Sequence, residues 1–453
     1  MRRTMNRPTI ALVAALVTAL PVAAQESPPP SVSHYTLDNG LELVVIPDRR
    51  APVVTHMVWY RTGGADDRVG QSGVAHFLEH LMFKGTAKYP AGTLESTVNE
   101  LGGQLNAFTT ADVTVYFETV PPDALGQMMD IEADRMRNLV LPKEVIDAER
   151  SVVLDERRQR VESQPGSILA EQVSATLFQN HPYRIPVIGW AHEIETLSRE
   201  GALSFYDQHY APNNALVVVA GDVDAEAVRQ MAEETYGNVE RGPELPPRAR
   251  PKEPPAQASR TVTLRDARVS LPSFTRNWVV PSYRQAEPGE AEALDVLSAI
   301  LSDGPQSRLY QALVVEAGIA AQARTSYDGG AFDYGRFVLY GAARPGTTLD
   351  ALEAAIDAEV DDIIANGISE TELNRVKTRF IRSTIFAQDD QVSMAQTYGL
   401  WLTTDRSIAD VAEWPDRIRA VTADDVKAVA AKYLRPATAV TGYLLPLAEE
   451  KNQ

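Results

Sequence analysis

Two histidines and a glutamate share one face of the strongly apolar segment at residues 71–86. His76, Glu79 and His80 are three and four residues apart, and this spacing puts their side chains on the same side of a helix. The rest of the circumference is apolar, so we expect the helix to be buried nearly all round. Its apolar residues are Val74, Phe77, Leu78, Leu81 and Met82. Two imidazoles one turn apart can hold one metal ion, and a carboxylate beside them can take a proton from water on that metal.

The pattern H-x-x-E-H is the inverted motif of zinc peptidases. The alternative is that the imidazoles are core histidines with ordinary hydrogen bonds, because short motifs also arise by chance. Burial of all three polar groups without partners would cost several kcal/mol, which favours the metal site. We expect Ser72 to be the N-cap of the helix and the helix to end near Gly85.

Two more glutamates lie on the apolar stripe of a later helix, which we expect to begin near Pro142. Glu149 and Glu156 are in register with Val145, Val152 and Val153. A metal ion would explain one buried carboxylate, and a hydrogen bond to a ligating imidazole would explain the other. Glu156 is therefore the candidate third ligand, and Glu149 is the candidate hydrogen-bond partner of a ligating imidazole. The alternative is that the stripe rotates and both carboxylates face water, which the arginines nearby would allow.

The elements around these helices predict a mixed α+β unit. We expect strands at 34–37, 41–46, 53–61, 104–109 and 113–120, and helices at 93–101 and 122–138. The strand at 104–109 could be an edge strand near the metal, where an extended peptide would pair with its backbone. Periodicity alone is equally compatible with an ordinary hairpin inside the sheet.

A proline-rich stretch at 241–260 divides the chain, and the order of elements then recurs. Strands are expected at 261–264, 271–280, 322–326 and 336–340, and helices at 291–301, 307–315 and 349–387. The fold prediction is α+β, with two homologous α/β-sandwich halves, each a mixed sheet with helices packed on it. The predicted boundaries are 30–240 for the metal-bearing domain, 241–260 for the linker and 261–448 for a second domain without a metal site. The glycines at 329–335 lack the spacing of a phosphate loop and predict a turn.

The N-terminal segment and the composition bear on compartment and partners. Arginines 2, 3 and 7 precede an apolar run at 10–20 and small residues up to Ala24, which predicts a signal peptide at 1–24. An uncleaved anchor is the alternative; after cleavage we expect no integral membrane segment, and export to a periplasm is the expectation. The net charge of -18 argues against nucleic acid or an anionic membrane as partner. The absence of cysteine excludes disulfides and thiolate chemistry.

With these motifs the chain resembles the pitrilysin/insulinase family of zinc peptidases and is similar to its short-chain branch, which includes the mitochondrial processing peptidase. The family pattern is H-x-x-E-H, then G-G-x-x-N-A, then E-R followed by a ligand Glu on the same helix. The matching residues are His76–His80, Gly102–Ala107, and Glu149–Arg150 with Glu156. Further matches are His181-Pro182-Tyr183, Gly189 and Tyr210–Asn214, so the resemblance covers almost all of the chain after residue 24.

The resemblance implies one zinc ion per chain, bound by His76, His80 and Glu156. It implies that Glu79 is the catalytic base, that Glu149 supports a ligand, and that Asn106 and Ala107 line the substrate. The expected activity is that of an exported zinc metalloendopeptidase acting on peptides or unfolded segments. The remaining histidines, at 34, 56, 181, 192 and 209, lack partners at ligand spacing and are expected to be structural or exposed.

One departure from the family pattern concerns residues 313–321. Family members that act alone usually carry an Arg and a Tyr that reach the substrate and its oxyanion, but Val314 and Ala321 stand at these positions here. Loss of one oxyanion donor typically costs about 10²–10³ in turnover. We therefore expect a heterodimer in which a homologous, metal-free subunit supplies the Arg and the Tyr. The alternative is a non-catalytic assembly or scaffold subunit of a peptidase-like complex.

Overall fold

The computed structural model describes residues 31–447 of the chain. The predicted signal peptide at 1–24 lies outside the described residues. None of the described helices combines the length and the apolar character needed to cross a membrane.

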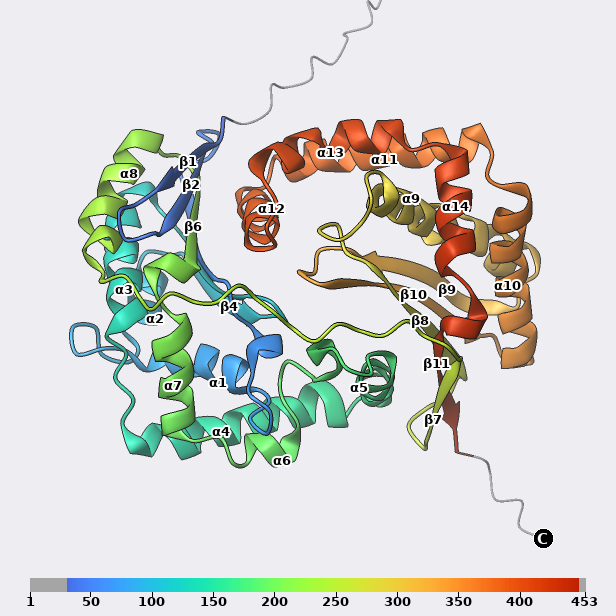
Figure 1. Ribbon diagram of the computed structural model, residues 1–453, viewed down its shortest axis with the longest axis horizontal. Helices are drawn as coiled ribbons and strands as arrows, with labels where there is room; N and C mark the ends of the chain where they lie inside the picture. The colour runs from blue at the N-terminus through green and yellow to red at the C-terminus, as the bar shows by residue number, and fades with distance from the viewer. Residues whose placement is uncertain (1–30, 448–453) are drawn as a thin grey trace, which may run out of the picture.

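The first half contains one mixed sheet with helices packed on it (Figure 1). Its strands are β1 (Ser33–Thr36), β2 (Glu42–Pro47), β3 (Val54–Tyr60), β4 (Gln104–Thr109), β5 (Thr114–Val120) and β6 (Ala215–Gly221). Its helices are α1 (Val74–Leu81), α2 (Thr93–Glu100), α3 (Leu125–Arg137), α4 (Lys143–Arg157), α5 (Pro165–Leu177), α6 (Ala191–Ile194), α7 (Arg199–His209) and α8 (Ala225–Glu234).

The second half begins after the extended, proline-rich segment that crosses the molecule in Figure 1. Its strands are β7 (Arg260–Asp266), β8 (Ser273–Pro281), β9 (Ala320–Asp328), β10 (Tyr334–Ala343) and β11 (Val440–Pro446). Its helices are α9 (Glu290–Ser302), α10 (Leu349–Asn366), α11 (Glu370–Ala387), α12 (Gln391–Thr403), α13 (Ile408–Ala420) and α14 (Ala423–Tyr433). The residues from Tyr310 to Glu316 form a π-helical segment, and 329–333 form the predicted turn.

The two sheets have the same strand order and the same strand directions. The first is ordered β1-β2-β6-β3-β5-β4 and the second β7-β11-β8-β10-β9. Each strand from β2 to β6 therefore corresponds to the strand whose number is five higher, for example β2 to β7 and β6 to β11. In both sheets the first pair of this common set is parallel (β2 with β6, β7 with β11), and the others are antiparallel. The predicted fold of two homologous α/β halves is confirmed.

Each half also covers a sheet of the other half. Helix α12 packs on β6 and β3 of the first sheet, where its Met394 and Tyr398 meet the buried Trp59. Helix α5, from the first half, packs on β11 and β7 of the second sheet. The domain division at 241–260 stays a prediction, since the packing joins the halves on both sides of it.

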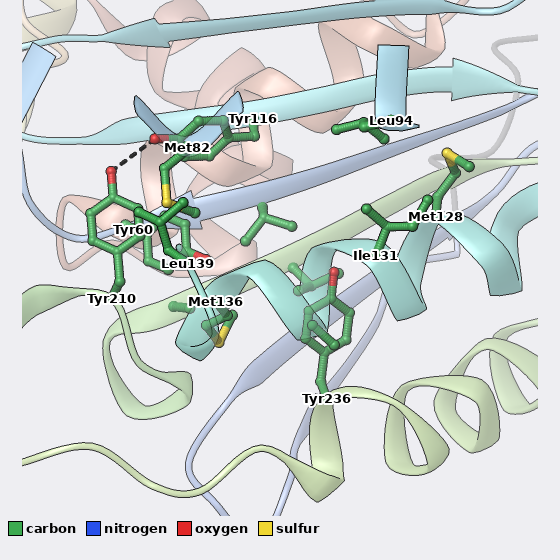
Figure 2. Close-up of a cluster of buried hydrophobic side chains, with 14 of the residues drawn as sticks. Tyr60, Met82, Leu94, Tyr116, Met128, Ile131, Met136, Leu139, Tyr210 and Tyr236 are labelled. Atoms are coloured by element: carbon green, nitrogen blue, oxygen red, sulfur yellow. Dashed lines mark hydrogen bonds between the residues drawn. The ribbon is translucent and has the colours of Figure 1, made fainter. Parts of the chain in front are cut away.

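Helix α1 is fixed to the first sheet by a core of aromatic and sulfur-containing side chains (Figure 2). Met82, directly after α1, packs in this core beside Tyr116 of β5, and the Tyr116 hydroxyl is 2.9 Å from that of Tyr210. Seven of the eight residues of α1 are buried, as the sequence predicted. Replacing a buried Met by Ala typically costs about 2–5 kcal/mol, so this packing holds the helix firmly in place.

Candidate metal centre

The start of α1 differs from the sequence prediction. Gly73, not Ser72, is the N-cap, with φ at 86°, and the carboxylate of Asp67 accepts the N–H of Gly73 at 2.6 Å and of Ala75 at 3.1 Å. The Ser72 hydroxyl is used elsewhere, because its Oγ accepts the N–H of Trp190 at 3.0 Å. A Cβ at Gly73 would lie 2.6 Å from a backbone oxygen of residue 188, so only glycine fits this turn. The end of the helix follows the prediction, since a 3₁₀ turn leads to Gly85 at φ 83°.

Helices α1 and α4 bring the three expected ligands together. Oε2 of Glu156 lies 3.5 Å from Nε2 of His76 and 3.3 Å from Nε2 of His80. One ligand atom from each residue lies within 4.8 Å of those from the other two. The buried stripe of α4 is narrower than the sequence indicated, because Val152 is 49% exposed. Glu149 is buried, as the sequence indicated. Within residues 31–447 this is the one cluster of three or more such side chains.

The two distances from the Glu156 carboxylate to the imidazole nitrogens suit a divalent cation. Tetrahedral zinc with bonds of about 2.0–2.1 Å places neighbouring ligand atoms about 3.3–3.4 Å apart. Oε2 of Glu156 is buried and has no hydrogen-bond partner among the described residues, although two ring nitrogens face it. A cation between the three atoms would satisfy this oxygen, so the donor set fits zinc.

His80 is oriented by a chain of charged groups. Its Nδ1 lies 2.8 Å from Oε1 of Glu149, whose other oxygen is 2.5 Å from Nζ of Lys84. Burial works to raise the pKa of Glu149, but the hydrogen bonds from His80 and Lys84 outweigh it and lower that pKa. Sequence reasoning did not single out Lys84, although it lies four residues after His80 and therefore on the same side of the helix. Among the described residues Nδ1 of His76 has no partner, so only the His80 ring is held by a second carboxylate.

The surroundings shift the pKa values of the two imidazoles in opposite directions. Burial, followed by the charge of His80, lowers the pKa of His76 to about 4. Burial also acts against a charged His80, but the hydrogen bond to Glu149 and the nearby negative charge of Glu156 prevail and raise its pKa to about 9. A metal ligand must be unprotonated, so cation binding at neutral pH releases a proton from His80.

Glu79 has a single strong partner, Thr109 at the end of β4. The Thr109 hydroxyl donates to Oε2 of Glu79 at 2.6 Å. Burial raises the pKa of Glu79, while this hydrogen bond opposes the rise. A raised carboxyl pKa suits a group that takes a proton near neutral pH and returns it. In the sequence, Thr109 could be recognised only as one of the alternate positions 105, 107 and 109, which share a face of the predicted strand. Nothing in the sequence paired Thr109 with Glu79.

Strand β4 forms an edge of the first sheet and pairs with β5 alone among the described strands. Asn106 is exposed, and its side-chain oxygen accepts the N–H of Ala107 at 2.9 Å. A bound peptide could replace this side chain as acceptor, since extended peptides add to such edges through main-chain hydrogen bonds. The edge ends at Thr109 and thus beside Glu79.

Among the described residues, the second half contains no similar cluster of candidate ligands. Helix α9 follows β8 as α1 follows β3, and all seven histidines of the chain precede residue 210. Val314 is half-buried in the π-helical segment and Ala321 is exposed on β9. The other histidines have other partners or none: His56 lies 2.6 Å from Glu118, His181 lies 3.1 Å from Asp333, and His192 is 78% exposed.

The chain is similar to known peptidases. Residues 43–190 match the family model "Insulinase (Peptidase family M16)", and residues 196–380 match "Peptidase M16 inactive domain". The zinc protease PqqE of Helicobacter pylori is 28% identical over 92% of this chain and 93% of its own length. An uncharacterized zinc protease of Streptomyces coelicolor is 30% identical over 91% of this chain and 90% of its own. The crystal structure of a protease from Helicobacter pylori superposes with a TM-score of 0.85 at 28% identity, covering 92% of this chain and all of that one.

Proposed function

Because the chain belongs to the insulinase family of peptidases, peptidase family M16, we propose that it is a zinc-dependent metalloendopeptidase that hydrolyses peptides or unfolded segments. The observation that carries the proposal is the position of the Glu156 carboxylate, 3.3 and 3.5 Å from two imidazole nitrogens, with Glu79 on the same helix face. Relatives named zinc proteases support the choice of metal.

The proposed site residues are His76, His80 and Glu156 as ligands, Glu79 as base, Glu149 as support, and Asn106 and Ala107 as substrate-binding residues. Zinc bound there would polarise the peptide carbonyl and lower the pKa of water to about 7. Glu79 accepts the proton of the attacking water and delivers it to the leaving amine. The free edge of β4 holds the peptide extended, and Thr109 keeps the Glu79 carboxylate at the end of that edge.

Two substitutions test this function. Glu79→Gln should retain zinc and lose peptide hydrolysis, because the amide keeps the shape of the side chain but cannot accept the proton. Glu156→Gln should lose zinc, measured as metal content after dialysis. Turnover by Glu79→Gln would exclude Glu79 as the base, and full zinc occupancy of Glu156→Gln would exclude Glu156 as a ligand.

We also propose that the chain is exported, with a periplasm as its compartment, and that it is the catalytic subunit of a heterodimer. Support for export is the N-terminal segment 1–24. Support for the heterodimer is the apolar pair Val314 and Ala321, where a homologous, metal-free subunit would supply an Arg and a Tyr. Peptidase assays on the chain alone and with a co-purified homologue test this: full activity of the chain alone would refute the heterodimer.

The second candidate is a non-catalytic assembly or scaffold subunit. The same two positions, Val314 and Ala321, favour it, and both lie within residues 196–380, which match the model "Peptidase M16 inactive domain". The assays above separate the candidates, since a scaffold subunit would hydrolyse no peptide either alone or with its homologue.

A further inference from the structure

Arg160 places a guanidinium beside the candidate metal centre. Helix α4 widens into a π-helical turn at Arg158–Glu162, directly after the residues that carry Glu156. Nη1 of Arg160 lies 2.8 Å from Oε1 of Glu156, and the Arg160 side chain is 74% exposed. A guanidinium has five N–H donors, and this contact uses one of them. Single π-helical turns inside α-helices are frequent at functional sites.

The Glu156 carboxylate connects this guanidinium to the ligand cluster. One of its oxygens faces Arg160, and the other faces Nε2 of both imidazoles. The guanidinium is therefore on the side of α4 where the three candidate ligands meet.

A positive group beside the metal can assist peptide hydrolysis. When water adds to the carbonyl carbon, the carbonyl electron pair moves to the oxygen, which becomes negative. The C–N bond then breaks and the amine leaves with the proton that Glu79 took from the water. Donors aimed at that oxygen stabilise the transition state. Lys84 pairs with Glu149 at 2.5 Å, and the side chains at positions 314 and 321 carry no hydrogen-bond donor.

We propose that Arg160 is a catalytic residue that donates an N–H to the substrate carbonyl oxygen as that oxygen becomes negative. This inference rests on the proposed peptidase function and names the donor that this chain itself contributes. The exposed guanidinium would donate from the solvent side of Glu156, and its contact with Glu156 would keep it beside the site. A homologous subunit would then supply further donors in addition to Arg160.

The simpler role for Arg160 is to hold Glu156 in its ligand orientation, and the test must separate the two. Arg160→Gln and Arg160→Ala are compared with Arg158→Gln and Arg158→Ala. Arg158 lies in the same turn, is 63% exposed and pairs with Asp155 instead of the site. Four quantities are measured on the full chain: zinc affinity, kcat, KM, and the affinity for a phosphinic peptide, whose tetrahedral anionic group resembles the transition state.

A donor to the oxyanion predicts that kcat falls about 10²–10³-fold in both Arg160 variants. The phosphinic peptide should lose affinity by a similar factor, while KM and zinc affinity change only a few-fold. Added guanidine should restore part of the turnover of Arg160→Ala, and the Arg158 variants should match the unsubstituted protein. An unchanged phosphinic-peptide affinity, or a loss of turnover that excess zinc repairs, would overturn the inference.

These outcomes are distinct from a failure of the proposed function. If the unsubstituted protein neither binds zinc nor hydrolyses peptides, the function and the inference both fall. If it does both and the Arg160 variants equal it, only the role of Arg160 is refuted.

Discussion

The Thr109 hydroxyl donates a hydrogen bond of 2.6 Å to Oε2 of Glu79 and so joins the last residue of the edge strand to the proposed base. A hydrogen bond to a charged group contributes about 1.5–3 kcal/mol. Thr109→Val keeps the shape of the side chain and removes the donor, so kcat should fall about 10- to 100-fold with zinc content unchanged. Thr109→Ser keeps the hydroxyl and is the matched control. Equal kcat values for the Val and Ser variants would contradict this role.

Glu149 should control zinc affinity although it is not a ligand. It accepts from His80 at 2.8 Å and thereby fixes the ring orientation, and loss of such a partner typically lowers metal affinity about 10- to 100-fold. Competition with a zinc chelator would measure the effect in Glu149→Gln. The exposed Glu144, in the first turn of the same helix, provides the control Glu144→Gln. If both variants bind zinc equally well, Glu149 serves only to pair with Lys84.

Asp295 of α9 makes stability depend on pH. Burial raises the pKa of this carboxyl from its ordinary 3.8 to about 7, although the Tyr283 hydroxyl donates to it. The folded state therefore binds the proton more tightly than the unfolded state, and this group lowers stability progressively as pH rises from about 4 to 7. The whole effect is at most about 4 kcal/mol, of which about 2–3 kcal/mol falls between pH 5 and 8.

Asp295→Asn should remove that part of the pH dependence. Urea unfolding at pH 5 and pH 8 would show a smaller loss of stability in the variant than in the unsubstituted protein. Because the amide oxygen of the substituted side chain can still accept from Tyr283, the neutral contact is kept. Parallel pH profiles for the two proteins would show that the Asp295 carboxyl does not titrate in this range.

Gly399 allows α12 to lie directly on the first sheet. A Cβ at this position would overlap the indole ring of the buried Trp59. Gly399→Ala should therefore destabilise the protein by about 1–3 kcal/mol, even though alanine favours a helix. Gly126→Ala in α3 is the control, because its Cβ would meet only Met231 at 3.7 Å. Thermal unfolding of the two variants checks this, and an increase in stability for both would refute the tight contact.

Spacing alone was sufficient to predict which residues of α1 share a face, because a helix fixes that relation locally. It also predicted the repeated order of strands in the two halves, which the sheets confirm. The N-cap was predicted wrongly because the choice between Ser72 and Gly73 depends on distant groups. Asp67 caps the helix and the N–H of Trp190 takes the serine hydroxyl, and neither contact is visible in a local pattern.

For the same reason, the periodicity of the sequence could not predict contacts between residues that are far apart in the chain. Thr109 and Glu79 are 30 residues apart, and their contact depends on how β4 lies across α1. The packing of α5 and α12 on the opposite sheets is likewise set by the arrangement of the two halves. The amphipathic pattern of a helix shows that it has a buried face, but it does not identify the sheet that buries it.

The packing of α12 on the first sheet also bears on how such a chain can evolve. If the two halves arose by duplication, the copy without the candidate metal centre would still be needed for packing. Here that copy supplies the helix that covers Trp59 and its neighbours, so its loss would leave an apolar face of the other copy open to water. Selection on the folding of the half with the candidate metal centre would therefore also preserve the other half.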